Sequence, residues 1–102
     1  MTDIEASRRA LVTRILEGPG SADSEMRRAA FDGTARSEPV RELVMKVVTR
    51  ASEIGDPDVA RARESGTSED AIFEVVVCAA VGRATRRHEA ALSALSTCTK
   101  KE

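Results

Sequence analysis

The chain has 102 residues, which is enough for one domain and too few for two. Aromatic residues make up only 2% of it, so the core has to be built from Leu, Ile, Val and Ala, and a composition rich in Ala, Arg and Glu favours helices over sheets. The net charge of −1 provides no overall field that would gather nucleic acid or anionic lipid, and we expect neither as a partner.

The first third of the chain predicts two helices. Residues 2–16 form the first, with an apolar stripe along one face. That stripe comprises Ile4, Leu11, Val12, Ile15 and Leu16. The run Gly18-Pro19-Gly20 ends this helix, and a shorter helix is expected from Ser21 to about residue 31. A turn is expected at Asp32-Gly33.

Two further helices are expected in the middle of the chain. Ser37 can cap the first of them, Pro39 suits its first turn, and its apolar spacing continues to Ile54. The dipeptide Asp56-Pro57 opens a short helix that ends at Gly66.

The longest predicted helix covers about residues 68–95. Thr67 and Asp70 have almost the spacing of a capping box at its start. Residues 71–81 are apolar on nearly every face, and a helix of this kind has to be buried on all sides. Because so small a domain struggles to cover such a helix alone, we expect neighbouring subunits to cover part of it. Gly82 either bends the helix or lets another backbone approach closely.

Glu74 and Cys78 are the two candidate reactive groups within this apolar segment. A carboxylate in a dry site can act as an acid or base, although a structural carboxylate paired with an arginine is the favoured interpretation of Glu74. Cys78 could be a peroxidatic or acyl-accepting thiol, which requires cationic neighbours that lower its pKa. The nearest charge on the helix is Glu74, and a carboxylate raises the pKa of a thiol, so a small buried side chain is expected instead.

His88, the only histidine, is the third candidate catalytic residue. It lies about 15 Å along the helix from Cys78, so the two can meet only across a subunit interface, and a surface histidine is the favoured interpretation. Arg83, Arg86 and Arg87 share a helix face that could bind phosphate or nucleic acid. With no interleaved aromatic residues, a solvated face or one that pairs with acidic groups is favoured.

Cys78 and Cys98 are far apart in the sequence and indicate neither a disulfide framework nor a zinc ligand set. We therefore expect no metal and no cofactor. The N-terminal residues lack the basic and apolar regions of a signal peptide, and the longest apolar run, residues 75–81, is too short to cross a bilayer. These features predict a reduced, cytoplasmic protein without a membrane partner.

The stretch Ser65-Gly66-Thr67-Ser68-Glu69-Asp70-Ala71-Ile72-Phe73-Glu74, followed by an Ala-rich apolar helix that continues to Leu92, resembles a known signature. It is similar to that of the alkylhydroperoxidase D-like, or carboxymuconolactone decarboxylase-like, family. The resemblance covers about residues 40–95. It implies an all-α orthogonal bundle that assembles into trimers or hexamers.

The peroxidase members of this family carry a C-x-x-C-x-x-x-H segment just before the signature. In this chain the matching positions fall near Ala51, Ile54 and Asp58, so the redox thiols and the histidine are absent. The catalytic histidine of the decarboxylase members has no clear counterpart either. The resemblance therefore implies the fold but not the activity.

The sequence thus predicts a single all-α domain over residues 1–102, an orthogonal bundle of about five to six helices. It divides into N-terminal helices (1–36), a family-like core (37–95) and a frayed tail (96–102). We expect a homo-oligomeric accessory or small-ligand-binding protein, with its pocket between helices or subunits, that is not an enzyme. The alternatives are a decarboxylase-, isomerase- or peroxidase-like enzyme for small carboxylic acids, lactones or hydroperoxides that uses Glu74 or Cys78, and a nucleic-acid-binding protein.

Overall fold

A computed structural model describes residues 3–35 and 40–100, with the side chains of the last two of these residues excepted. The described chain is all-helical and contains no strand, which confirms the predicted all-α class. Its elements are α1 (Asp3–Glu17), α2 (Ser24–Asp32), α3 (Val40–Arg50), a 3-10 helix (Ala51–Glu53), α4 (Asp56–Glu64) and α5 (Glu69–Lys100).

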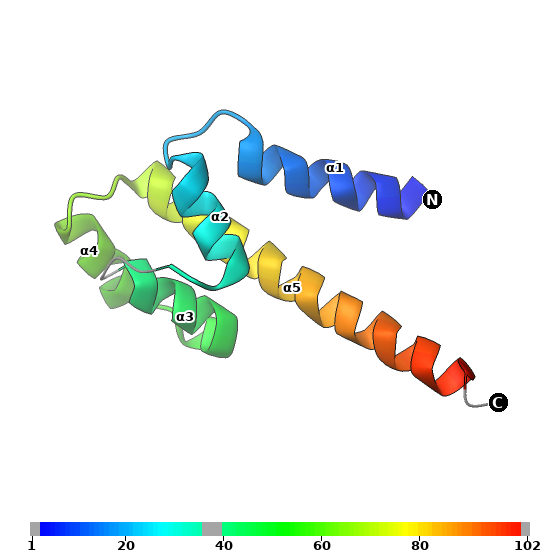
Figure 1. Ribbon diagram of the computed structural model, residues 1–102. Coiled ribbons are helices and arrows are strands. Elements are labelled where there is room, and N and C mark those ends of the chain that lie inside the picture. Colours follow the sequence, from blue (N-terminus) through cyan, green and yellow to red (C-terminus); the bar gives the residue numbers. More distant parts are fainter. Residues whose placement is uncertain (1–2, 36–39, 101–102) are drawn as a thin grey trace.

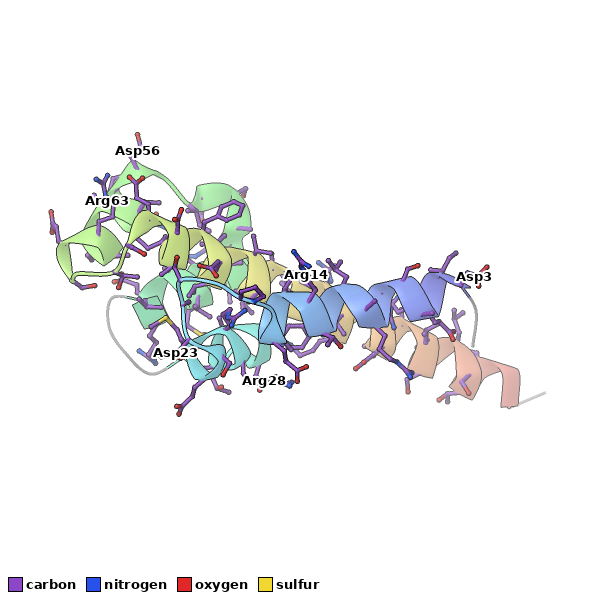
Figure 2. The ribbon with its side chains drawn as sticks, turned by 90° about the horizontal axis from the view of Figure 1, so that it is seen from above. Asp3, Arg14, Asp23, Arg28, Asp56 and Arg63 are labelled. Carbon is purple, nitrogen blue, oxygen red and sulfur yellow. The ribbon has the colours of Figure 1, made fainter. Side chains whose placement is uncertain are left out.

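The first half of α5 is the axis of the molecule. Helices α2, α3 and α4 pack against one side of it, whereas α1 and the second half of α5 extend away from this bundle in the same direction (Figure 1). α1 runs antiparallel to α5, and seen from above it lies over α5, with Asp3 and Arg14 marking its two ends (Figure 2). The molecule therefore consists of a small bundle with two projecting helices.

The core lies where α2 and α3 meet α5. Val44 of α3 and Val75, Cys78 and Ala79 of α5 are each at most 1% exposed. These α5 residues follow the 3–4 spacing of one helix face, so that face is buried while the opposite face is left outside. A smaller cluster of Leu43, Ala62 and Ile72 seals α4 against α3 and α5.

Two helix starts differ from the sequence prediction. α2 begins at Ser24 and not at Ser21, because the carboxylate of Asp23 accepts the N–H of Met26 at 2.7 Å and caps the helix there. At the start of α5, Ser68 is the cap in place of Thr67, since its hydroxyl accepts the N–H of Ala71 at 3.1 Å.

Three other helix boundaries either differ from the prediction or lie outside the described residues. α3 ends at Arg50 and gives way to the 3-10 helix, four residues before the predicted end. The predicted frayed tail is wrong as far as residue 100, because α5 continues to Lys100 with no Gly or Pro to stop it. The predicted cap Ser37 and first-turn Pro39 lie outside the described residues.

The molecule is elongated. Its extents are 55 × 27 × 20 Å and its radius of gyration is 15.6 Å, whereas a compact domain of 100 residues has about 13 Å. In the described part of the chain, no helix is both long enough and apolar enough to cross a membrane.

Candidate functional site

Glu74 lies at the corner between α1 and α2. Its side chain projects from α5 and is half-buried. The N–H of Ser21 donates to both carboxylate oxygens, at 3.0 and 2.8 Å, and the N–H of Ala22 donates to Oε2 at 3.3 Å. A charged acceptor strengthens such hydrogen bonds, so Glu74 ties the loop before α2 to α5.

The predicted partner of Glu74 was an arginine, and the structure corrects this. The carboxylate binds main-chain amides, and no described ion pair includes it. Its oxygen Oε1 also occupies the space that a Cβ would take at Gly20, so a side chain at position 20 would displace the Glu74 carboxylate from this position. Both oxygens accept hydrogen bonds from the loop, so the carboxylate has a structural role at this corner.

Arg27 of α2 is the buried charge beside this corner, and the sequence interpretation missed it. It is only 6% exposed. Its Nη1 donates to the carbonyl of Ile15 at 3.1 Å and to that of Gly18 at 2.7 Å, and its Nε has no hydrogen-bond partner within the described structure. Arg27 therefore caps the C-terminal end of α1, where carbonyl groups lack helical partners and cations are favoured.

Cys78 is buried against the same end of α1. Its Sγ lies 3.6 Å from the carbonyl oxygen of Ile15, which also accepts from Arg27. Burial raises the pKa of the Cys78 thiol, and of the two nearby charges Arg27 lowers it and Glu74 raises it. A buried thiol with a raised pKa is a weak nucleophile, so this environment suits a packing role.

The remaining candidates lie elsewhere on α5. His88 is exposed on the projecting half of the helix, away from Glu74 and Cys78. Cys98, near the end of the same helix, is an exposed free thiol. The structure therefore brings Glu74 and Cys78 to one corner but does not bring His88 to them.

The three arginines beyond Gly82 do not form one solvated face. Arg86 donates from Nη1 to the carbonyl of Phe31, near the C-terminal end of α2. Arg83 is half-buried, and Arg87 is exposed. Arg86 thus acts on α2 as Arg27 acts on α1, with a guanidinium at a helix C-terminus.

The surface has hollows, but the described side chains form no metal site. Within the described parts of the chain, no three His, Cys, Asp or Glu side chains gather as metal ligands would. A hollow of about 600 Å³ lies beside α2, with Met26, Ala29 and Val40 among its apolar lining and Asp23 and Arg28 among its charged lining. This volume is within the range of small-molecule sites.

Comparisons of the chain with protein-family models, with curated proteins and with solved structures found no match. Function is therefore inferred from the geometry of this chain. At the α1–α2 corner, a carboxylate, a guanidinium and a thiol converge, and each has main-chain groups as its partners. That arrangement stabilises a corner of the fold.

Proposed function

We propose that this protein is a non-enzymatic, homo-oligomeric accessory or small-ligand-binding protein. The observation that carries the proposal is that its candidate reactive groups, Glu74 and Cys78, both contact main-chain groups of the same chain. Glu74 holds two loop amides, and Cys78 is buried against a helix end. Each of these contacts gives its side chain a structural role that accounts for its position in the fold.

The separation of the candidates supports the same conclusion. A thiol or hydroxyl nucleophile requires a base within hydrogen-bond reach. Among the described residues, the Cys78 thiol contacts the carbonyl oxygen of Ile15, and His88 lies ten residues further along α5, about 15 Å away. The raised pKa of Cys78 also opposes the formation of a thiolate at neutral pH.

The resemblance to the alkylhydroperoxidase D-like family is part of the proposal. It is supported by the local structure of the signature, in which Gly66 has a left-handed φ of 98° and Ser68 caps a long apolar helix. The absence of the family's redox motif from the sequence accords with a protein without thiol chemistry. We place the protein in the cytoplasm, where free thiols such as Cys78 and Cys98 are kept reduced.

Thiol titration tests this proposal. With an aromatic disulfide reagent, the native protein is expected to react rapidly at Cys98 only, and Cys78 is expected to react after denaturation. The native Cys98→Ser variant is then expected to show no rapid reaction. In the same preparation, consumption of an alkyl hydroperoxide in the presence of a dithiol is expected to match that of buffer. Turnover that disappears in Cys78→Ser would contradict the proposal and favour the peroxidase alternative.

A further inference from the structure

The molecule exposes more surface than a compact monomer of its size. Its accessible surface is 7068 Å². A monomer of 10.9 kDa is expected to expose about 5,600 Å², so the excess is about 1,500 Å². A standard interface buries about 800 Å² on each partner. The excess is therefore large enough for a stable contact.

One face of α5, here termed the outer face, carries a row of apolar side chains that the rest of the chain leaves uncovered or only partly covered. It comprises Phe73, Val77, Ala80, Val81, Ala84, Ala91, Leu92 and Leu95. Their three- and four-residue spacing places them along one side of the helix over about 33 Å. Every one of them is exposed or half-buried, and Phe73 is 69% and Leu92 49% exposed. Exposed apolar side chains gathered along one helix face are typical of an interaction site.

α1 adds apolar surface to the same projecting part. Ile4 is 81% and Leu11 51% exposed. They lie seven residues apart, and thus on one side of α1, whereas Val12 and Leu16 of this helix pack against the core. α1 and the second half of α5 diverge in Figure 1, and each exposes apolar side chains to a neighbouring molecule.

We propose that a second copy of this chain packs on the outer face, with the two α5 helices antiparallel and a two-fold axis at Ala84. This pairing rests on the proposed homo-oligomer and specifies its interface. Phe73 and Leu95 are each eleven residues from Ala84, and Val77 and Ala91 are each seven residues from it. Antiparallel packing thus sets Phe73 opposite the partner subunit's Leu95 and leaves small residues at the centre.

The middle of the outer face suits close helix packing. Ala80 and Ala84 are exposed there and let two helix backbones approach each other. His88, the polar position within this spacing, falls opposite the partner subunit's Ala80 in this register, so its ring keeps room to reach solvent. Both α1 helices then lie on the same side of the α5 pair, where Ile4 and Leu11 extend the contact.

The overall shape selects the antiparallel arrangement. Helices α2, α3 and α4 pack against only the first half of α5 (Figure 1). A parallel pair would crowd both bundles at one end, whereas an antiparallel pair places them at opposite ends and covers each projecting half of α5. Antiparallel packing also opposes the two helix dipoles.

The symmetry restricts the assembly. A two-fold contact occurs in a dimer and in a hexamer built from two trimers, but not in a simple trimer. Native mass spectrometry of the full chain is therefore expected to give a dimer or a hexamer. A monomer at all accessible concentrations would overturn both this inference and the proposed oligomer, and a simple trimer would overturn this inference alone.

Disulfide cross-linking tests the register. In a Cys98→Ser background, Ala84→Cys is expected to form a covalent dimer under mild oxidation, seen on a non-reducing denaturing gel. Ala90→Cys, at an exposed alanine on the other side of α5, is the matched control and is expected to remain unlinked. Leu95→Cys is also expected to remain unlinked, because it faces the partner subunit's Phe73. Efficient linking through Leu95→Cys, or its absence with Ala84→Cys, would overturn the antiparallel register.

Charge insertion tests the energetics of the interface. Ala84→Glu is expected to weaken self-association at least tenfold by sedimentation, since it places two carboxylates at the two-fold axis, and Ala90→Glu is expected to leave it unchanged. Both positions are exposed, so both variants are expected to keep the far-UV circular dichroism of the wild type. If the chain forms oligomers that Ala84→Glu leaves unchanged, the proposed oligomer stands and this interface is wrong.

Discussion

Glu74 connects two parts of the chain that are 53 residues apart. Glu74→Gln replaces a charged acceptor by a neutral amide. Its oxygen can accept from both loop N–H groups at the Oε2 position, but its NH₂ group then faces the N–H of Ser21 at the Oε1 position. We expect the free energy of unfolding to fall by about 1–3 kcal/mol, measured by urea denaturation. Glu89→Gln, at an exposed position on the same helix, is the control and is expected to change it by less than about 0.5 kcal/mol. Equal effects of the two variants would show that the corner gains nothing from the carboxylate.

Asp58 gives a pH-dependent contribution to stability. The N–H of Gly55 donates to its carboxylate at 3.0 Å and Lys46 does so at 3.1 and 3.2 Å, and these contacts hold its pKa below the ordinary value of 3.8. A lowered folded-state pKa stabilises the fold above the unfolded-state pKa, and this stabilisation is lost as the pH falls through the folded-state pKa.

The Asp58→Asn variant tests this contribution. The variant is expected to melt at a lower temperature than the wild type at pH 7. The difference in Tm is expected to shrink as the pH is lowered below about 4, because the wild-type carboxyl group then becomes neutral as well. A difference in Tm that stays constant from pH 7 to pH 3 would mean that the charge of Asp58 has no part in it.

The sequence identified some of these residues but not their partners. Glu74 stood out as a lone charge in an apolar helix, and Cys78 as a small buried side chain. The partners of Glu74 are main-chain amides. Every residue except proline has one, so these partners cannot be predicted from residue type. Arg27 could have been found, since it lies three residues before the buried Ala30 and so on the inner face of α2.

Gly82 is the point at which two elements touch. A Cβ at this position would overlap the carbonyl oxygen of Phe31 in α2, so the glycine permits the close approach of α2 and α5. Of the two roles expected for Gly82, this is the one that the structure supports.

The Gly82→Ala variant tests this contact. Alanine is favoured over glycine within a helix by about 1 kcal/mol, yet we expect destabilisation by about 1–3 kcal/mol because α2 has to move. Thermal unfolding measures the effect, and Ala90→Gly at an exposed site calibrates the helix propensity. A more stable Gly82→Ala protein would mean that α2 shifts at no cost.

The number and type of the helices could be predicted because the spacing of apolar residues and the Gly and Pro residues that end helices are local features of the sequence. The start of α2 was wrong because two candidate caps compete, and the amide of Ser21 is taken by Glu74 while Asp23 caps the helix. The end of α5 was wrong because Ser, Thr and Cys are weak helix formers that nonetheless continue an established helix. The helix propensity of a single residue does not take into account that extending an existing helix is easier than starting a new one.

At the scale of the whole molecule, the apolar stretch of α5 predicted a helix that one small domain could not cover. The structure agrees in part, since its inner face is buried and Phe73 remains exposed. The sequence did not predict that α1 and the second half of α5 would project together. Their direction follows from the α1–α2 corner, whose geometry depends on contacts between residues that are distant in the sequence.

The contacts of the α1–α2 corner also determine when α1 can pack during synthesis of the chain. α1 leaves the ribosome before α5, and the carboxylate that closes its corner belongs to a residue made 53 positions after Ser21. At 5–20 residues per second, this delay is about 3–10 s. Throughout that time Leu16, which is 3% exposed in the finished protein, has no α5 to pack on. α1 is therefore complete several seconds before the residues that hold it in place have been made.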